Sequence, residues 1–135
     1  MARGLHRIGD TWSMLILRNA SAGQTRFDQF QKNLGIAPNI LTRRLAALTT
    51  EGLLERRRYS ERPARYEYIL TEAGVDFLPV LAALGAWGKK HFSDGNVSEL
   101  VDTRSGRPVL PVVVDRISGQ EIADMKLRTV TPASS

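Results

Sequence analysis

The stretch from Leu34 to Gly52 constrains the fold more than any other part of the sequence, because it marks the end of one helix and both ends of the next. Gly35 is typical of the residue just past a helix end, since glycine adopts the left-handed conformation freely. Pro38 fits the first turn of a helix, where its missing N–H group costs nothing. The sequence therefore predicts two helices joined by a tight turn, the second over residues 38–50 and ended by Gly52.

Apolar residues also recur at helical spacing before this turn. One predicted helix covers residues 8–20, with Asp10 or Thr11 as its N-cap. The other covers residues 26–35 and carries its apolar stripe on one face. These two segments and the helix over residues 38–50 predict three consecutive helices.

After Gly52, two segments rich in β-branched and aromatic residues surround a polar loop that contains Pro63. We predict a β-hairpin over residues 53–70 whose loop is longer than the tight two-residue type. A further helix is predicted over residues 71–92, with Pro79 near its first two turns, where proline can bend a helix.

The order of three helices, a hairpin and a helix predicts a mainly α fold with a small β-hairpin wing, in the α+β class. It is the order of a winged helix-turn-helix. The tail differs, because it suggests two short strands around Gly119 and a frayed end, and it contains no evident repeat. We therefore predict a domain over residues 1–92 and a short β-rich C-terminal extension over residues 93–135, a hairpin with a frayed end.

Charge is unevenly distributed along the chain, whose net charge is +5. Residues 1–92 carry fourteen Lys and Arg against eight Asp and Glu, whereas residues 93–135 carry five against six. The excess in the first part is expected of a domain that contacts a polyanion, although a merely soluble basic surface explains the charge equally well. The chain has no cysteine, which excludes disulfides and cysteine-bearing zinc sites.

Other features argue against a membrane protein and against an enzyme. No apolar run approaches the length of a membrane span and no signal-peptide core follows Met1, so we predict a cytoplasmic protein with no membrane partner. The two histidines, His6 and His91, are far apart in the sequence, and no catalytic spacing, phosphate-binding loop or metal-ligand cluster accompanies them. We predict no enzymatic activity, no metal and no cofactor.

The helix over residues 38–50 has two distinct faces. Leu41, Leu45 and Leu48 fall within a narrow arc that would pack on the core. The opposite side is small or polar, and asparagine and arginine can make bidentate contacts with adenine and guanine in the DNA major groove. The alternative is an ordinary solvated face. The predicted base-contacting residues are Pro38, Asn39, Thr42 and Arg43. Arg44 lies nearer the core edge and is expected to brace the helix or to reach a phosphate.

Five arginines gather on the predicted hairpin, where each contact with a phosphate would release counterions without reading sequence. Arg57 is expected to point away from Arg56 and Arg58 and to pair with Glu55 or Glu67. For any single arginine the alternative is a weak surface ion pair. The predicted DNA-backbone contacts are Arg26, Arg56, Arg58, Arg62 and Arg65.

Together these motifs resemble one family. The chain carries Gly9 and Trp12, then Arg26-Phe27, Leu34-Gly35-Ile36, Leu41-Thr42-Arg43-Arg44-Leu45, Gly52-Leu53-Leu54-Glu55-Arg56, a wing with Tyr59, Pro63, Arg65, Glu67 and Tyr68, Leu70-Thr71 with Gly74, and a final Trp87. In this order, over residues 5–92, they closely resemble the HxlR-type (MarR-like) winged-helix transcriptional regulators of bacteria and archaea.

The resemblance implies a homodimeric regulator, acting as a repressor on a near-palindromic operator in double-stranded DNA, with its first and last helices in the dimer. The residues expected there are Leu5, Ile8, Trp12, Leu81, Leu84 and Trp87. Some of these residues could instead complete the core of the monomer. The operator half-sites would be about 34 Å apart.

Two departures from the family pattern limit which family properties this chain is expected to share. Many members have a cysteine before the first helix, and this chain has none, so thiol-based sensing is excluded. Many also end in a C-x-x-C-G zinc knuckle, where this chain has Asp115 and Ser118, which do not make a tetrahedral zinc site. Two alternatives stay open: a winged-helix module for protein or RNA contact, and a regulator that senses an unidentified small-molecule effector through its extension.

Overall fold

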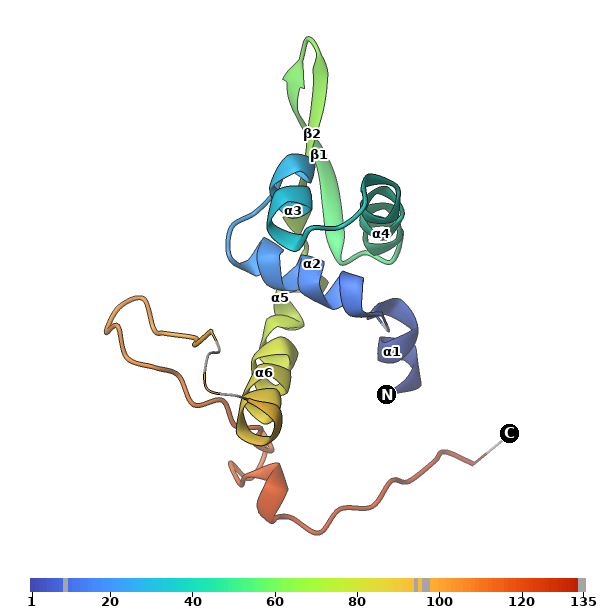
Figure 1. The fold of residues 1–135 in the computed structure, drawn as a ribbon. Coiled ribbons are helices and arrows are strands. Elements are labelled where there is room, and N and C mark those ends of the chain that lie inside the picture. Colours follow the sequence, from blue (N-terminus) through green and yellow to red (C-terminus); the bar gives the residue numbers. More distant parts are fainter. Residues whose placement is uncertain (9, 94, 96–97, 134–135) are drawn as a thin grey trace. The chain divides into compact units, whose positions relative to one another are not determined.

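The computed structural model spans all 135 residues and describes them except for residues 9, 94, 96–97 and 134–135 and the side chain of Ile8 (Figure 1). Its elements are α1 (Ala2–Ile8), α2 (Thr11–Ser21), α3 (Phe27–Leu34), α4 (Pro38–Thr50), β1 (Leu54–Glu61), β2 (Ala64–Leu70), α5 (Glu72–Asp76), α6 (Leu78–Phe92) and the short 3₁₀ helix η1 (Ile122–Asp124). The chain divides into two compact units, Met1–Leu81 and Ala82–Ser135. The predicted boundary between residues 92 and 93 stays a prediction.

Helices α2, α3 and α4 and the base of the hairpin surround the hydrophobic core of the first unit (Figure 1). The buried apolar side chains are Ile16, Leu17, Phe30, Ile36, Leu41, Leu45, Leu48, Leu53 and Leu54. Burial of each such side chain stabilises the fold by about 1.5–3 kcal/mol relative to exposure. The core therefore fixes the positions of the elements that surround it.

The ends of these helices follow the chemistry of their capping residues. The Asp10 side chain accepts a hydrogen bond from the backbone N–H of Ser13 at 2.8 Å and so caps α2. Gly35, with φ of 64°, ends α3 in the left-handed conformation. Pro38 is the first residue of α4. The predicted helix over residues 38–50 is confirmed at both ends.

Strands β1 and β2 form an antiparallel hairpin that projects away from α2, α3 and α4 (Figure 1). Pairing continues as far as Glu61 opposite Ala64, so the connecting loop consists only of Arg62 and Pro63. The prediction of a longer loop, over residues 60–64, is wrong. A run of polar residues suggests a loop in a sequence, but the tip of an exposed hairpin covers no core. Polar residues can therefore pair there as well as apolar residues do.

Two helical segments differ from the prediction. Helix α1 was not expected, because Gly4 lies at its centre and glycine disfavours helices. The single helix predicted over residues 71–92 is wrong in its first part, where α5 and α6 are separated at Phe77. Pro79, the second residue of α6, explains the separation, since proline lacks the N–H group that a continuous helix requires.

The extension contains two turns of the same construction, which contradicts the prediction that the chain has no repeat. The pattern V-D-x-x-S-G occurs at residues 101–106 and again at residues 114–119. In each turn the aspartate carboxylate accepts a hydrogen bond from the serine hydroxyl, at 3.1 Å for Ser105 and 2.7 Å for Ser118. The glycine N–H then bonds the carbonyl of the same aspartate, at 2.7 Å in both turns.

Each of these turns is closed by one isolated β-bridge, Val101 with Pro108 and Val114 with Glu121. The predicted β character around Gly119 is thus present but short. Within the described residues of this extension, no large apolar side chain is fully buried. Local polar hydrogen bonds, rather than a core, define these turns.

Candidate nucleic-acid interface

Helix α4 presents its predicted base-contacting residues to solvent. Pro38, Asn39, Thr42 and Arg43 are all exposed, whereas the leucine stripe on the opposite side is buried. The Thr42 hydroxyl donates a hydrogen bond to the Pro38 carbonyl at 2.9 Å, which fixes the side chain against the first turn. No acidic residue occurs between Pro38 and Thr50, so the face is neutral or cationic throughout. Such a face can approach the electronegative base edges of a major groove.

Arg44 braces α4 against the start of α2, as expected. Its Nε lies 3.6 Å from Oδ1 of Asp10, the residue that also caps α2. Ion pairs at this separation and exposure contribute little energy, but they set an orientation. Next to this pair, a shallow depression of about 480 Å³ is lined by Trp12, Asn39, Ile40, Arg43 and Arg44. Two of the predicted base-contacting residues therefore share one concave surface.

On the hairpin, Arg56 and Arg58 gather around one aromatic ring. Arg58 lies opposite Tyr66 in the strand pairing, and its Nη2 donates a hydrogen bond to the Tyr66 hydroxyl oxygen at 3.0 Å. The guanidinium carbon of Arg56 lies 4.4 Å from the centre of the same ring and that of Arg58 lies 5.4 Å from it. Both distances are typical of cation–π contacts. We call Arg56, Arg58 and Tyr66 the wing cluster.

The hydrogen bond in the wing cluster changes the acidity of its members. Arg58, first through the hydrogen bond and then through its charge, lowers the pKa of the Tyr66 hydroxyl, to which Arg56 adds a smaller contribution. Tyr66 and Glu61 in turn raise the pKa of the Arg58 guanidinium. The Arg58 guanidinium therefore stays fully charged wherever DNA binding is measured.

The remaining arginines of the hairpin are also exposed. Arg57 points to the other face and pairs with Glu55 at 3.2 Å, as predicted. Arg62 lies in the two-residue loop, and Arg65 lies opposite Ser60. Five guanidinium groups outnumber the three carboxylates of the hairpin, Glu55, Glu61 and Glu67, and leave its surface net positive.

Arg26, at the start of α3, belongs to the same surface. Its guanidinium carbon lies 4.5 Å from the centre of the Tyr59 ring on β1. The chain beside it is fixed to the hairpin, because the Tyr68 N–H donates a hydrogen bond to the Thr25 carbonyl at 2.7 Å. The Gln29 side chain accepts hydrogen bonds from the N–H groups of Thr25 and Arg26 and so fixes the segment that precedes α3. The cationic surface thus extends from the hairpin to the first turn of α3.

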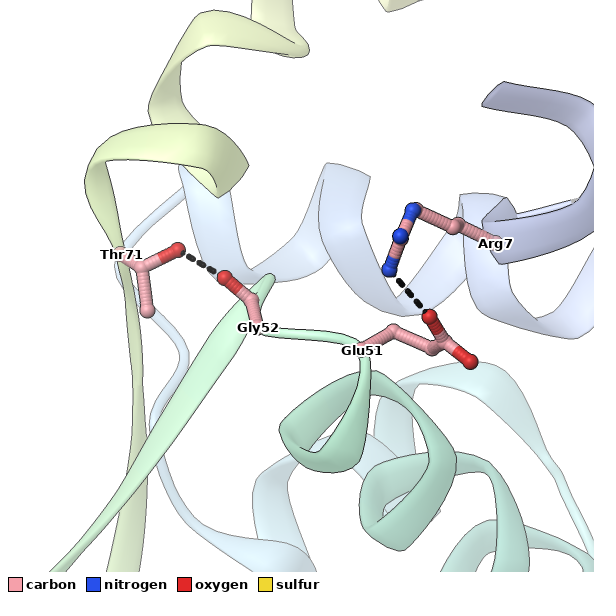
Figure 2. Close-up of polar contacts among 4 residues, drawn as sticks. All are labelled: Arg7, Glu51, Gly52 and Thr71. Carbon is pink, nitrogen blue, oxygen red and sulfur yellow. Dashed lines mark hydrogen bonds and ion pairs between the residues drawn. The ribbon is translucent and has the colours of Figure 1, made fainter. Parts of the chain in front are cut away.

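The turn that joins α4 to β1 is held by hydrogen bonds from two sides (Figure 2). The Thr71 hydroxyl donates to the Gly52 carbonyl at 2.6 Å and accepts from the Gly74 N–H at 3.2 Å, so it also caps α5. Arg7 on α1 forms an ion pair with Glu51, the C-cap of α4. This turn sets how α4 and the hairpin lie relative to each other.

Gly74 packs so closely on this turn that no other residue fits. A Cβ atom at Gly74 would lie 2.3 Å from the Leu53 carbonyl oxygen and 2.9 Å from a methyl carbon of Leu70. Leu53 is the last residue of the turn between α4 and β1, and its carbonyl accepts a hydrogen bond from the Thr71 N–H at 3.1 Å. Gly74 is therefore required because the turn that leads into the wing passes directly against it.

This arrangement of a solvent-facing helix beside a cationic hairpin agrees with the sequence comparison. A sequence profile of HxlR-like helix-turn-helix proteins matches residues 7–96. The chain belongs to the HxlR-like helix-turn-helix family. It is a helix-turn-helix transcriptional regulator, and its fold is the winged-helix fold that the sequence predicted.

Relatives of this HxlR-like protein extend over nearly the whole chain. An HTH-type transcriptional regulator of Mycobacterium tuberculosis is 37% identical over 134 residues, which cover 98% of this chain and 83% of the relative. The crystal structure of the candidate transcription factor PA1607 is 40% identical, with a TM-score of 0.83, and covers 94% of this chain and 92% of that chain. A second candidate transcription factor, from Pseudomonas aeruginosa, is 45% identical with a TM-score of 0.69, over 98% and 93% of the two chains.

The residues of the HxlR-like chain that were predicted to form the dimer differ in exposure. Leu5 is 52% exposed, Leu84 is 44% exposed and Trp87 is 55% exposed. Trp12 and Leu81 are half-buried and pack against the core of the first unit. Ile8, a predicted dimer residue, and Gly9, part of the family pattern, lie outside the residues whose side chains are described. Exposed leucine and tryptophan leave apolar surface available to a second copy.

The sequence predicted no metal and no membrane partner for the HxlR-like chain. In the described part of the chain, no three His, Asp or Glu side chains are grouped as metal ligands. No helix of the described chain is long and apolar enough to cross a bilayer. In the extension, hydrogen bonds from the Ser118 hydroxyl, the Ser118 N–H and the Ile117 N–H lower the pKa of Asp115. That carboxylate is held within its own turn.

Sequence reasoning included Tyr59 in the wing pattern but missed Tyr66, and it predicted no contact between either tyrosine and the arginines. For Tyr66, the sequence contained only part of the signal. In an antiparallel hairpin, residues on one face alternate along each strand, so arginines at positions 56 and 58 face whatever lies opposite them. The turn at residues 62–63 alone would place Arg58 opposite Glu67; a register shift between Arg58 and Ser60 brings Tyr66 opposite Arg58 instead.

Proposed function

We propose that this HxlR-like regulator binds a near-palindromic operator in double-stranded DNA as a homodimer, with α4 in the major groove and the β1–β2 hairpin as a wing on the DNA backbone. The observation that carries the proposal is the exposed face of α4 with Asn39, Thr42 and Arg43, set beside a hairpin with five arginines. An α-helix fits the major groove, where Arg can contact guanine and Asn can contact adenine. The arginines would contact phosphates on either side.

The proposed contacts divide into two classes. Pro38, Asn39, Thr42 and Arg43 would meet base edges and determine which sequence is bound. The backbone contacts would be made by Arg26, Arg56, Arg58, Arg62 and Arg65. Since phosphate contacts are the same on every duplex, these residues would set affinity without sequence preference.

For the dimer, the proposed interface consists of Leu5, Ile8, Trp12, Leu81, Leu84 and Trp87. Exposed Leu84 and Trp87 on α6 support it, because an apolar patch of this kind is expected to be covered. Sedimentation of the full chain tests it: Leu84→Ser should weaken the dimer. Val75→Ser is the matched control, since Val75 is 49% exposed on α5 and lies outside the proposed interface. Equal effects of the two substitutions would contradict this interface.

We also propose that the regulator acts as a repressor in the cytoplasm. A dimer that occupies a promoter excludes polymerase by its presence alone and needs no additional surface. A reporter gene behind the operator should therefore rise in expression when the regulator is deleted, and a fall would contradict the assignment.

DNA binding itself is tested by a mobility-shift experiment with duplex DNA from the promoter region of the regulator's own gene. We expect a complex at low salt that weakens steeply as salt rises, because each phosphate contact releases counterions. Selection of bound fragments from the source genome would then provide the operator. Unchanged DNA mobility at low salt, with a folded dimer confirmed, would remove the DNA-binding proposal.

A further inference from the structure

We propose that Tyr66 is a positioning residue for DNA binding: it gathers the guanidinium groups of Arg56 and Arg58 into one site for a backbone phosphate. This inference rests on the proposed function, and it concerns a residue that the family pattern P-x-R-x-E-Y leaves unspecified. Tyr66 would act through the two arginines and need not contact DNA itself.

The geometry of the wing cluster supports a gathering role. Arg56 and Arg58 are two residues apart on β1, so their side chains project from the same face of the strand. Two like charges in this position repel each other and would separate in water. Instead, both guanidinium carbons lie near one ring, at 4.4 Å and 5.4 Å from its centre. The electron-rich face of the ring offsets the repulsion.

The hydroxyl group of Tyr66 adds direction to this contact. It accepts a hydrogen bond from Nη2 of Arg58 at 3.0 Å, which fixes the plane of the guanidinium group. A planar guanidinium that is already oriented loses less rotamer freedom when it binds an anion. The ring therefore holds two cations near each other, and the hydroxyl orients one of them.

A carboxylate marks where an anion binds this cluster. Oε2 of Glu61 lies 3.2 Å from Nη1 of Arg58, on the part of the guanidinium that Tyr66 does not use. The Glu61 side chain is 81% exposed, so nothing except this contact retains it. A phosphate oxygen can take the place of the carboxylate oxygen, because both are anionic acceptors that arginine binds with the same geometry. The wing cluster is thus an anion site in which a phosphate could replace the Glu61 carboxylate.

Two other tyrosines of the hairpin have different surroundings. Tyr68 packs against the hydrophobic core, and its N–H is bonded to the chain before α3. Tyr59 contacts Arg26 instead of the wing cluster. Tyr59 is therefore a matched control, since it is an exposed tyrosine on the same hairpin with a different arginine beside it.

The test is a double-mutant cycle measured by DNA affinity over a range of salt concentrations. Tyr66→Leu should weaken binding to operator and scrambled duplexes alike by about two- to fivefold, which is the range for exposed cation–π contacts. Tyr66→Phe, which retains the ring, should recover most of that loss. In a chain that also carries Arg56→Ala and Arg58→Ala, Tyr66→Leu should have no further effect. Tyr59→Leu should keep its full effect in that background.

A measurement without DNA separates this inference from the proposed function. In the free protein, the Cδ protons of Arg56 and Arg58 should show ring-current shifts by NMR that disappear in Tyr66→Leu. Absence of these shifts from the wild-type chain overturns the inference, as does an equal effect of Tyr66→Leu with and without the two arginines. Shifts that are present in a chain that binds no duplex at low salt would instead contradict the proposed function.

Discussion

Helix α4 and the β1–β2 hairpin both direct arginines toward solvent, but they are held in different ways. α4 buries Leu41, Leu45 and Leu48 in the core, so its outer face is fixed by packing. The hairpin leaves the core after its first residues, and its arginines are held by partners outside the core, the half-buried Tyr66 and the exposed Glu61.

This difference in support fits the two roles proposed for these regions, base contact for α4 and phosphate contact for the hairpin. Base edges must be met in one geometry, which a helix anchored in a core provides. Phosphates accept hydrogen bonds from many directions, and an exposed ribbon with oriented side chains suffices for them. In the proposed complex, a rigidly held helix would contact bases and an adjustable hairpin would contact phosphates, and the turn at residues 51–53 joins the two.

The largest effect is expected where the two regions are joined. Gly74→Ala would place a methyl group 2.3 Å from the Leu53 carbonyl oxygen, so the turn or α5 must move. We expect a loss of about 3 kcal/mol in the free energy of unfolding. Urea denaturation measures it. Gly85→Ala is the control, because a Cβ there meets no atom within 4 Å and alanine favours helices. Similar stability of both variants would contradict the close packing of this joint.

The second largest effect is expected on the exposed face of α4. Arg43→Ala should weaken binding to the operator by about 1–3 kcal/mol, roughly five- to 150-fold, because a base contact is lost. Its affinity for scrambled duplexes should change much less. Competition binding with matched and scrambled DNA measures the ratio. An equal loss on both would assign Arg43 to the backbone and would remove the distinction between the two regions.

The hairpin should behave in the opposite way. Arg62→Ala removes one charge at the loop, so affinity should fall by a similar factor on every duplex. The slope of log affinity against log salt should become less steep by about one. A change in sequence preference with an unchanged slope would show that the hairpin reads bases.

A smaller effect of the opposite sign is expected at Glu61. Glu61→Gln removes the acid that competes with phosphate for Arg58, so binding to all duplexes should tighten by about twofold, within the range of exposed ion pairs. Glu55→Gln is the matched control, since Glu55 pairs with Arg57 on the other face. Weaker binding by Glu61→Gln would mean that this carboxylate orients Arg58 and does not occupy the phosphate site.

The smallest expected effect is a pH dependence. The pKa of Tyr66 lies below its ordinary value near ~10 because of Arg58. As pH rises toward that value, a phenolate forms among Arg56, Arg58 and Glu61 and repels phosphate. DNA affinity of the wild-type chain should therefore decline more between about pH 8 and 10 than that of Tyr66→Phe. Parallel declines would exclude Tyr66 as the titrating group.

The sequence predicted the part of the fold whose ends carry strong local signals. Pro38 and Gly52 bracket α4, and the spacing of its leucines determined which face is buried, so Asn39 and Arg43 were placed outward correctly. The hairpin loop was predicted too long because exposed tip residues obey no burial pattern. Helix α1 has no capping signal, and its contact with α4 is a tertiary ion pair that no local pattern contains.

The arginines of the wing were also found from sequence, but their organisation was not. Contacts across a hairpin depend on the register of its strands. A one-residue error in the turn moves the side chains of a strand to the opposite face. The pairing of Arg58 with Tyr66 depends on the loop at Arg62 and Pro63 and also on a register shift between Arg58 and Ser60 that no local pattern predicts. The repeated turns of the extension were missed because a six-residue pattern is short, and its meaning lies in the hydrogen bonds between Asp and Ser.

Methylation interference on the selected operator tests the central division most directly, because a methyl group on guanine N7 blocks only the major groove. For the wild-type chain, interference is predicted at guanines in two half-sites about 34 Å apart, and Arg43→Ala should no longer be sensitive to at least one guanine in each. Arg62→Ala should retain the full wild-type pattern. Interference at the same guanines in the Arg43→Ala variant, or interference only from methyl groups in the minor groove, would contradict the assignment of α4 as the reader.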